Sequence, residues 1–245
     1  MIPKVINYCW FGPTPIPSIV QKCIASWKEQ CPDYKIQLWN EKNYDVNKIV
    51  YTQECYKNKK YAFLTDYARL DILYHNGGIY LDTDVLLLKS LTPLLNNGAF
   101  MAFEKKGRVA TGLGMACEAG NPVVKENMEY YEKNDFFNKH GDFVPPICIP
   151  VTTKLLISKG LKYKENKIQH LKNMTVYPSD YLAPKKMGTN RLDITDNTYG
   201  IHLYASSWYK GNKFVKKVKY RLIPLKEFIK YKIYNEYELY VQQLW

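Results

Sequence analysis

The stretch AFLTDYARLDILYHNGGIYLDTDVLLLKSL, residues 62–91, joins a helical pattern to a strand pattern and a pair of aspartates. Aromatic or apolar side chains recur at the spacing of one helix face: Phe63, Tyr67, Leu70 and Tyr74. This spacing predicts a helix over 61–76, with Gly77 at the C′ position where helices commonly end. Residues 79–81 then predict a short buried strand that ends at Asp82.

Asp82 and Asp84 lie two residues apart, between the apolar runs 79–81 and 85–88. In an extended chain this spacing places both carboxylates on the same side. Two like-charged carboxylates in apolar surroundings are costly without a cation, and Mg²⁺ or Mn²⁺ accepts oxygen ligands. Such an ion could bridge a diphosphate and neutralise charge on a leaving group. Taken alone, such a pair is more typical of a solvated turn, and it is the apolar residues on both sides that favour the metal site.

Asp66 and Arg69 lie one turn apart on the helix that leads into this strand. At this spacing the two side chains share a helix face. They form either a structural ion pair or a donor and acceptor pair for sugar hydroxyls, and the sequence leaves both interpretations open. Asp71, further along the helix, is expected to face water or to cap a loop.

The flanking sequence predicts an α/β protein. Residues 4–10 and 34–39 are rich in strand formers, and a helix is expected over 18–30, with Ser18 as its N-cap. A strand, a helix and a strand in this order predict a βαβ unit with parallel strands. Further strands are expected at 98–104, 113–117, 174–177 and 199–204, and further helices at 122–131 and 152–158.

The composition is that of a soluble globular chain. Its 245 residues suffice for one sizeable α/β domain or two small ones, and no apolar run reaches the 18 residues of a membrane span. Six cysteines occur without a C-x-x-C pair, which argues against a zinc ribbon and makes a reducing cytoplasm with free thiols the simplest compartment. The net charge of +12 predicts an anionic partner beyond a nucleotide diphosphate.

The C-terminal segment from residue 213 to residue 245 carries eight Lys or Arg and three Glu among aromatic and aliphatic residues. It is interpreted in two ways, as a basic surface that contacts an anionic membrane peripherally or as a packed helical cap with a solvated basic face. We therefore expect a catalytic domain over 1–210 and a basic, aromatic, helical tail over 211–245. In the first interpretation the protein is cytoplasmic and lies at the inner face of the cell membrane.

Residues 62–91 resemble the core of glycosyltransferases that carry the DXD sugar-binding region, including glycosyltransferase family 32 and capsular-polysaccharide enzymes. They resemble the glucosylating bacterial toxins more distantly. IPKVINYCWFG (2–12) and SWKEQCPDYKIQLWNE (26–41) are similar to the first two strands of this family, and HLYASSWYKG (202–211) to its closing segment. The resemblance, which covers about 1–210, implies a GT-A fold with a Rossmann-like mixed sheet flanked by helices, and transfer with retention of configuration.

The resemblance also implies roles for single residues. Trp10 would stack on the base of the donor, Asp66 and Arg69 would hold the transferred sugar, and Asp82 would contact ribose and sugar. Asp84 would bind Mn²⁺ or Mg²⁺; His202 stands where the toxins have an acidic ligand, and either a ligand role or a structural role is open to it. The catalytic candidates are Asp82, Asp84, Arg69 and Trp208. The donor-binding candidates are Trp10, Phe11, Asp66, Arg69, Gly78, Asp82, Thr83, Ser206, Ser207, Trp208 and Lys210.

The predicted function is transfer of a hexose or N-acetylhexosamine from a nucleotide-diphosphate sugar, with UDP favoured, to a saccharide. A lipid-linked oligosaccharide in bacterial capsule or surface polysaccharide synthesis is the expected acceptor. No dedicated base is evident, although Glu104 and Glu118 are expected on the acceptor side. The alternatives are a metal-dependent sugar-nucleotide hydrolase and a glycosyltransferase that modifies a protein. A nucleic-acid partner is not expected, since no RNA- or DNA-binding motif accompanies the positive charge.

Overall fold

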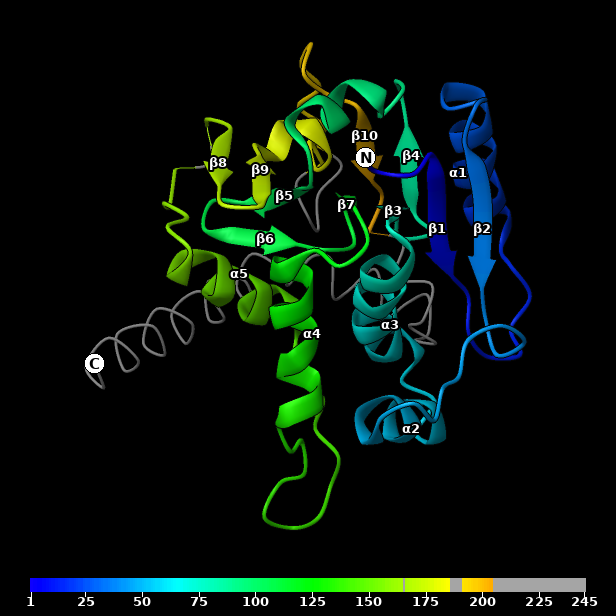
Figure 1. Ribbon diagram of the computed structural model, residues 1–245. Helices are drawn as coiled ribbons and strands as arrows, with labels where there is room; N and C mark the ends of the chain where they lie inside the picture. Colours follow the sequence, from blue (N-terminus) through cyan, green and yellow to red (C-terminus); the bar gives the residue numbers. More distant parts are fainter. Residues whose placement is uncertain (165, 186–190, 205–245) are drawn as a thin grey trace.

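The computed structural model describes residues 1–164, 166–185 and 191–204 (Figure 1). The predicted tail over 211–245 lies outside these residues, so the proposed division at residue 210 stays a prediction. The main sheet mixes parallel and antiparallel pairs, in the order β2 (Lys35–Trp39), β1 (Val5–Cys9), β3 (Gly78–Tyr80), β7 (Met115–Cys117), β5 (Phe100–Lys105), β9 (Met174–Tyr177) and β8 (Gln169–Leu171), with β6 (Arg108–Ala110) beside β5.

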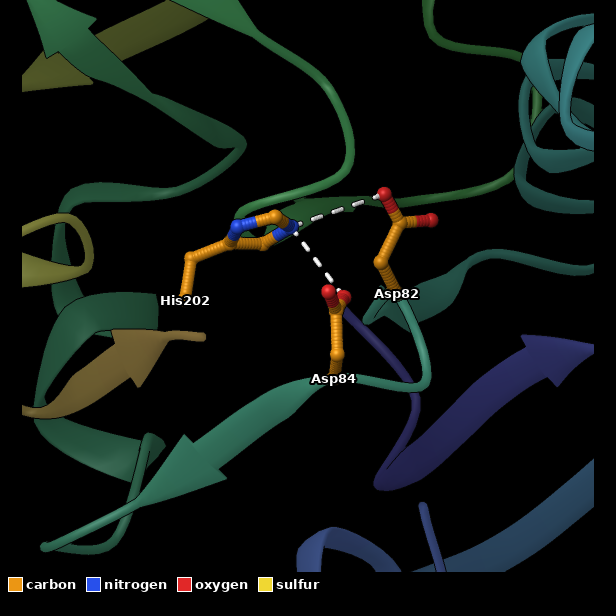
Figure 2. A group of neighbouring side chains, drawn as sticks. All are labelled: Asp82, Asp84 and His202. Carbon is orange, nitrogen blue, oxygen red and sulfur yellow. Dashed lines mark ion pairs between the residues drawn. The ribbon is translucent and has the colours of Figure 1, made fainter. Parts of the chain in front are cut away.

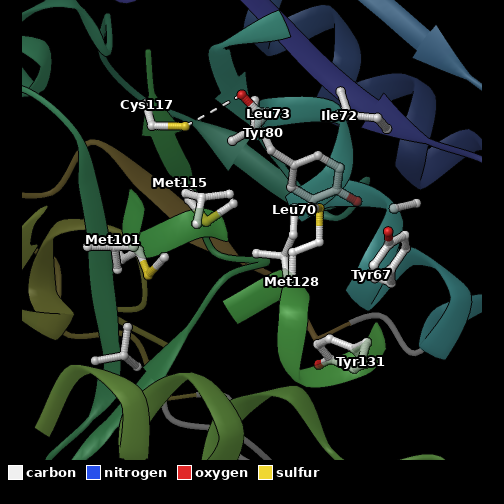
Figure 3. Close-up of a cluster of buried hydrophobic side chains, with 14 of the residues drawn as sticks. Tyr67, Leu70, Ile72, Leu73, Tyr80, Met101, Met115, Cys117, Met128 and Tyr131 are labelled. Atoms are coloured by element: carbon white, nitrogen blue, oxygen red, sulfur yellow. Dashed lines mark hydrogen bonds between the residues drawn. The ribbon is translucent and has the colours of Figure 1, made fainter. Parts of the chain in front are cut away.

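Both faces of this sheet are covered by apolar packing. Five α-helices are described: α1 (Ser18–Gln30), α2 (Val50–Lys57), α3 (Tyr61–Asn76), α4 (Pro122–Lys133) and α5 (Cys148–Ser158). Successive side chains of β3 alternate between the faces, so Ile79 packs in one cluster with Trp27 of α1, whereas Tyr80 packs in the other with Tyr67 of α3 (Figure 3). The α/β fold with a mixed sheet flanked by helices is thus confirmed and is consistent with a GT-A fold.

Helix α3 has the bounds that its apolar spacing predicts. Gly77 is the C-cap at φ +66°, a conformation that glycine adopts without strain, and its N–H donates to the Leu73 carbonyl. The expectation that Asp71 faces water is wrong. This carboxyl group is 3% exposed, and Lys48 Nζ lies 2.7 and 2.9 Å from its two oxygens. The reason is that α3 is buried on most sides, so its charged side chains meet partners from neighbouring loops.

The N-terminal βαβ unit has the predicted parallel arrangement. β1 pairs with β2 in register from Val5↔Lys35 to Cys9↔Trp39. Ser18 is not the N-cap of α1, however, and this prediction is wrong. The carbonyl of Pro17 already accepts the first helical hydrogen bond, from the N–H of Gln21 at 3.1 Å, so Pro17 occupies the cap position and Ser18 is the first helical residue.

Strand β4 (Val85–Leu87) leaves the main sheet and pairs antiparallel with β10 (Gly200–His202). His202 is the register partner of Val85, the residue after Asp84. Helix α1 lies against β4 and fixes it by two side chains: Trp27 Nε1 donates to the Val85 carbonyl at 2.7 Å, and Ser26 Oγ accepts from the Leu87 N–H at 3.0 Å. The βαβ unit therefore holds the strand that follows the aspartate pair.

Replacing Trp27 by phenylalanine tests this attachment. Trp27 is fully buried, so the change leaves the Val85 carbonyl without the indole donor and removes part of a packed ring. The free energy of unfolding should fall by about 1–3 kcal/mol, the cost of an unsatisfied buried acceptor. Urea denaturation measures it, and an unchanged midpoint would show that the hydrogen bond contributes nothing to the stability of β4.

All six cysteines are free thiols, as expected, and five of them are buried. Within the described ranges, none of the helices combines the length and the apolar character that a bilayer crossing requires.

Candidate active site

Asp82 and Asp84 belong to the turn that joins β3 to β4. The turn is closed by the Val85 N–H, which donates to the Asp82 carbonyl at 3.1 Å. The two carboxylates therefore converge because the chain turns between them, and the strand alternation assumed from the sequence is not the cause. Their side chains are 27% and 14% exposed, so they are partly shielded yet open to a ligand.

His202 completes a group that we call the Asp-Asp-His cluster: Asp82, Asp84 and His202 (Figure 2). Its three potential ligand atoms all lie within 4.8 Å of one another, and His202 Nε2 is 3.2 Å from Asp84 Oδ1 and 4.0 Å from Asp82 Oδ2. Two carboxylate oxygens and one imidazole nitrogen form a donor set that suits Mn²⁺, whereas Mg²⁺ more often takes oxygens alone. The residues present thus fit a divalent ion.

The charge on the two aspartates also acts on the imidazole. Burial lowers the pKa of His202, but the charge of Asp84, the hydrogen bond to it and the charge of Asp82 outweigh burial, so the pKa is raised. A metal ion needs the neutral imidazole and would replace this proton. The same negative charge that holds a proton on His202 can therefore hold a cation.

Arg69 links α3 to the cluster. Its side chain is 5% exposed, and Nη2 lies 2.9 Å from Asp66 Oδ1 and 3.3 Å from Asp82 Oδ1. Nη1 donates to Thr111 Oγ1 at 3.0 Å, and Nε donates to the Thr65 carbonyl at 3.1 Å. The predicted pairing of Asp66 with Arg69 is present, and it extends to Asp82, which sequence spacing does not indicate. A guanidinium held on this many sides is rigidly oriented.

Asp66 is a buried carboxyl group with an unusual environment. Burial raises its pKa to about 6, partly offset by the positive charge of Arg69, while the charge of Asp82 raises it further. The thiol of Cys148, the first residue of α5, forms a hydrogen bond with Asp66 that lowers the pKa of Asp66. Cys148 and Thr111 are site residues that sequence reasoning missed.

Replacing Asp66 by asparagine should change the pH dependence of stability. The folded pKa of about 6 exceeds the ordinary value of 3.8, so the folded state binds more protons between these values and the free energy of unfolding falls as pH rises through them. Asparagine removes this dependence. The stability of D66N relative to wild type should therefore increase by about 3 kcal/mol from about pH 3 to about pH 8. Urea denaturation in a chelator measures it; a constant difference would contradict the raised pKa.

The structure brings some of the other predicted residues to the same edge. β1 and β3 are parallel neighbours, so Trp10, which follows β1, lies at the edge where β3 leads to Asp82. The Trp10 ring is half-buried, and its Nε1 donates to the Thr14 carbonyl at 2.7 Å. Thr83 is half-exposed in the turn between the aspartates.

Two predicted donor-binding residues make packing contacts in the structure, and their donor-binding role stays a prediction. Phe11 is buried and packs edge-on against Tyr44 in the hydrophobic core, with ring centroids 5.7 Å apart. Gly78 begins β3 at φ +101°, where a Cβ would lie 2.8 Å from the Val5 carbonyl oxygen. Four predicted residues lie outside the described residues: Ser206, Ser207, Trp208 and Lys210.

The two glutamates expected on the acceptor side differ in their surroundings. Glu104 is buried at 8% exposure, lies 3.3 Å from Arg108 Nε and is close enough to help raise the pKa of His202. Glu118 accepts a hydrogen bond from Asn121 Nδ2 at 3.1 Å, next to the start of α4. Glu104 is therefore near the cluster, whereas Glu118 is engaged at a helix end.

Comparisons with known proteins point to one class of enzyme. Residues 17–101 match the family model described as "Glycosyltransferase sugar-binding region containing DXD motif". This range contains Asp66, Arg69, Asp82 and Asp84. The match thus covers the Asp66–Arg69 pair and both aspartates of the Asp-Asp-His cluster, whereas Thr111 and His202 lie beyond it.

Three relatives share parts of the chain. The protein named "Uncharacterized glycosyltransferase L373" of Acanthamoeba polyphaga mimivirus is 28% identical over 227 residues, 88% of this chain and 87% of that protein. Inositol phosphoceramide mannosyltransferase 1 of Schizosaccharomyces pombe is 32% identical over 41% of this chain and 33% of its own length. Lactosylceramide 4-alpha-galactosyltransferase of Mus musculus is 47% identical over 53 residues, 18% of this chain and 15% of its own. Together with the family match, these similarities support glycosyltransferase activity.

Proposed function

We propose that this protein is a metal-dependent, retaining glycosyltransferase that moves a hexose or N-acetylhexosamine from a nucleotide-diphosphate sugar, with UDP favoured, to a saccharide acceptor. The observation that carries the proposal is the convergence of the Asp-Asp-His cluster with Arg69 and Asp66. A divalent ion bound at the cluster would supply positive charge to the leaving diphosphate. Asp84 and His202 would hold this ion, and Asp82 would face both the ion and the donor.

The protein side of the reaction is binding and orientation. Asp66 offers an acceptor for sugar hydroxyls, and Arg69, held by Thr111 and Thr65, keeps both Asp66 and Asp82 in place. Trp10, at the end of β1, offers an aromatic face for the base. With retention, the acceptor hydroxyl attacks from the face that the diphosphate leaves, so the site needs charge stabilisation and no protein nucleophile.

The acceptor we propose carries a lipid. Two relatives are named for ceramide lipids, inositol phosphoceramide and lactosylceramide. The loop between α4 and α5 exposes Phe137, Val144 and Ile147 by 40%, 57% and 60%, and it leads directly into Cys148 beside Asp66. Exposed apolar side chains on a loop that leads into the site suit an acceptor with a lipid part at a membrane surface. A role in bacterial capsule or surface polysaccharide synthesis, at the inner face of the membrane, is part of this proposal.

A screen of UDP- and GDP-sugars with Mn²⁺ tests the proposal. A donor at 100 times its dissociation constant should stabilise the folded protein by about 2.7 kcal/mol, and a chelator should remove this gain. Thermal unfolding with each donor, with and without Mn²⁺, measures it. Stabilisation by no sugar nucleotide under any metal condition would contradict a donor site.

Two alternatives act on the same donor site. A sugar-nucleotide hydrolase would release nucleoside diphosphate at full rate without an acceptor, whereas a transferase should release it faster when a glycolipid acceptor is present. A protein-modifying glycosyltransferase would instead be accelerated by a polypeptide. Nucleoside diphosphate release measured with no acceptor, with a glycolipid and with a protein separates the three.

A further inference from the structure

Gly112 lies in the loop between β6 and β7, directly against the carboxylate of Asp82. A Cβ built on Gly112 would stand 1.8 Å from Asp82 Oδ2, 2.6 Å from Asp82 Cγ and 2.9 Å from Arg69 Nη1. The φ angle of Gly112 is not positive, so the backbone conformation at this position does not require glycine. What excludes a side chain at this position is the close approach of the carboxylate.

The two chain segments cannot simply move apart. The Asp82 N–H donates to the Gly112 carbonyl at 3.0 Å, which joins the two residues through their backbones. Asp82 Oδ1 is held by the Tyr80 hydroxyl at 3.0 Å and by Arg69 Nη2 at 3.3 Å. Oδ2 is therefore the oxygen that faces both Gly112 and His202 Nε2. A methyl group at position 112 would have to displace the carboxylate that points into the Asp-Asp-His cluster.

Thr111, the residue before Gly112, acts on the partner of Asp82. It is 1% exposed, and its Oγ1 accepts a hydrogen bond from Arg69 Nη1 at 3.0 Å. Two consecutive residues thus contact the two charged groups that link α3 to the aspartate turn. The sequence pattern alone indicates neither Thr111 nor Gly112 as a residue of the donor site.

We propose that Thr111 and Gly112 form a positioning segment for the donor site, in which Gly112 leaves the space that Asp82 Oδ2 occupies and Thr111 orients Arg69. This inference rests on the proposed function, because it explains how Asp82 is aimed at the metal and donor. Both residues act through Asp82 and Arg69, which carry the contacts to the ligand.

The test is Gly112→Ala, read by Mn²⁺ titration calorimetry and by UDP-dependent thermal stabilisation. We expect Mn²⁺ affinity to fall by about 10- to 100-fold, the range for losing a residue that orients a metal ligand. Thr111→Val should weaken UDP binding, and Thr111→Ser, which keeps the hydroxyl, should restore it. Wild-type affinity for Mn²⁺ and UDP in G112A would overturn the role of Gly112, and equal effects of the two Thr111 variants would overturn that of Thr111.

A double-mutant cycle separates this role from a general packing defect. In a D82A background the carboxylate is gone and only the contact with Arg69 Nη1 remains, so G112A should lower the urea midpoint by less than it does in the wild-type background. An equal loss in both backgrounds would overturn the proposal. This comparison needs no metal, so it decides the role of Gly112 even if the wild-type protein binds no donor. Failure of the wild-type protein to bind any donor would contradict the proposed function and not the role of Gly112.

Discussion

Asparagine at position 84 is expected to abolish Mn²⁺-dependent donor binding and transfer while leaving the fold intact. Asp84 Oδ1 lies 3.2 Å from His202 Nε2, and the side chain is 14% exposed. An amide keeps the shape of the carboxylate but loses its charge, so it is a poor ligand for a hard divalent ion. Transfer should fall by at least about 100-fold, as for loss of one group that stabilises the leaving charge. Release of nucleoside diphosphate and calorimetric Mn²⁺ binding measure the two effects.

Asp33→Asn is the matched control. Asp33 is an exposed aspartate between α1 and β2 that pairs with Lys4 at the surface, so the same chemical change there should leave turnover and Mn²⁺ binding at wild-type levels. Circular dichroism and urea denaturation establish that D84N is folded. Undiminished transfer by folded D84N would rule out Asp84 as a metal ligand and with it the proposed mechanism.

Arg69→Ala should damage both stability and activity. The side chain is almost fully buried and pairs with Asp66 and Asp82, so its removal leaves two carboxylates without their cation. Breaking a buried ion pair from one side costs about 3–5 kcal/mol of unfolding free energy. Donor binding should be lost even at temperatures where the variant is folded, because Asp82 is no longer held. Urea denaturation and UDP-dependent thermal stabilisation report the two losses.

A second variant shows whether the loss of stability comes from charge. In R69A/D66N a neutral amide replaces one of the two carboxylates that lack a cation. Part of the lost unfolding free energy should therefore return, although activity should not. Arg69→Lys keeps the charge but cannot reach Asp66, Asp82 and Thr111 together, and donor binding should stay impaired. An R69A protein as stable as wild type would show that the buried ion pairs of Arg69 with Asp66 and Asp82 do not stabilise the fold.

Much of the fold follows from local patterns in the chain. The spacing of apolar residues and Gly77 define α3 at both ends, and runs of strand formers locate β1, β2 and β9. Four short helices or strands, α2, β4, β6 and β8, are absent from the sequence-based expectations. They are three to eight residues long, too short for a periodic pattern to show. The pairing of β4 with β10 joins segments more than 100 residues apart, and no local pattern encodes it.

Some residues of the candidate site could also be predicted from local sequence patterns, whereas others could not. Asp66, Arg69, Asp82 and Asp84 stand out because charge interrupts apolar runs at helical or strand spacing, and the structure brings all four together with His202. Thr111, Gly112 and Cys148 do not stand out, because each acts only through a contact with a residue distant in the chain. Gly112 in particular has an ordinary backbone conformation, so nothing local marks it.

The antiparallel pairing of β4 with β10 has a consequence for synthesis of the protein. The imidazole of the Asp-Asp-His cluster comes from residue 202, whereas its carboxylates come from residues 82 and 84. During translation the βαβ unit and the aspartate turn leave the ribosome long before β10 does. A nascent chain therefore carries an incomplete Asp-Asp-His cluster until β10 has docked, and acquires the full set of three side chains only late in its emergence.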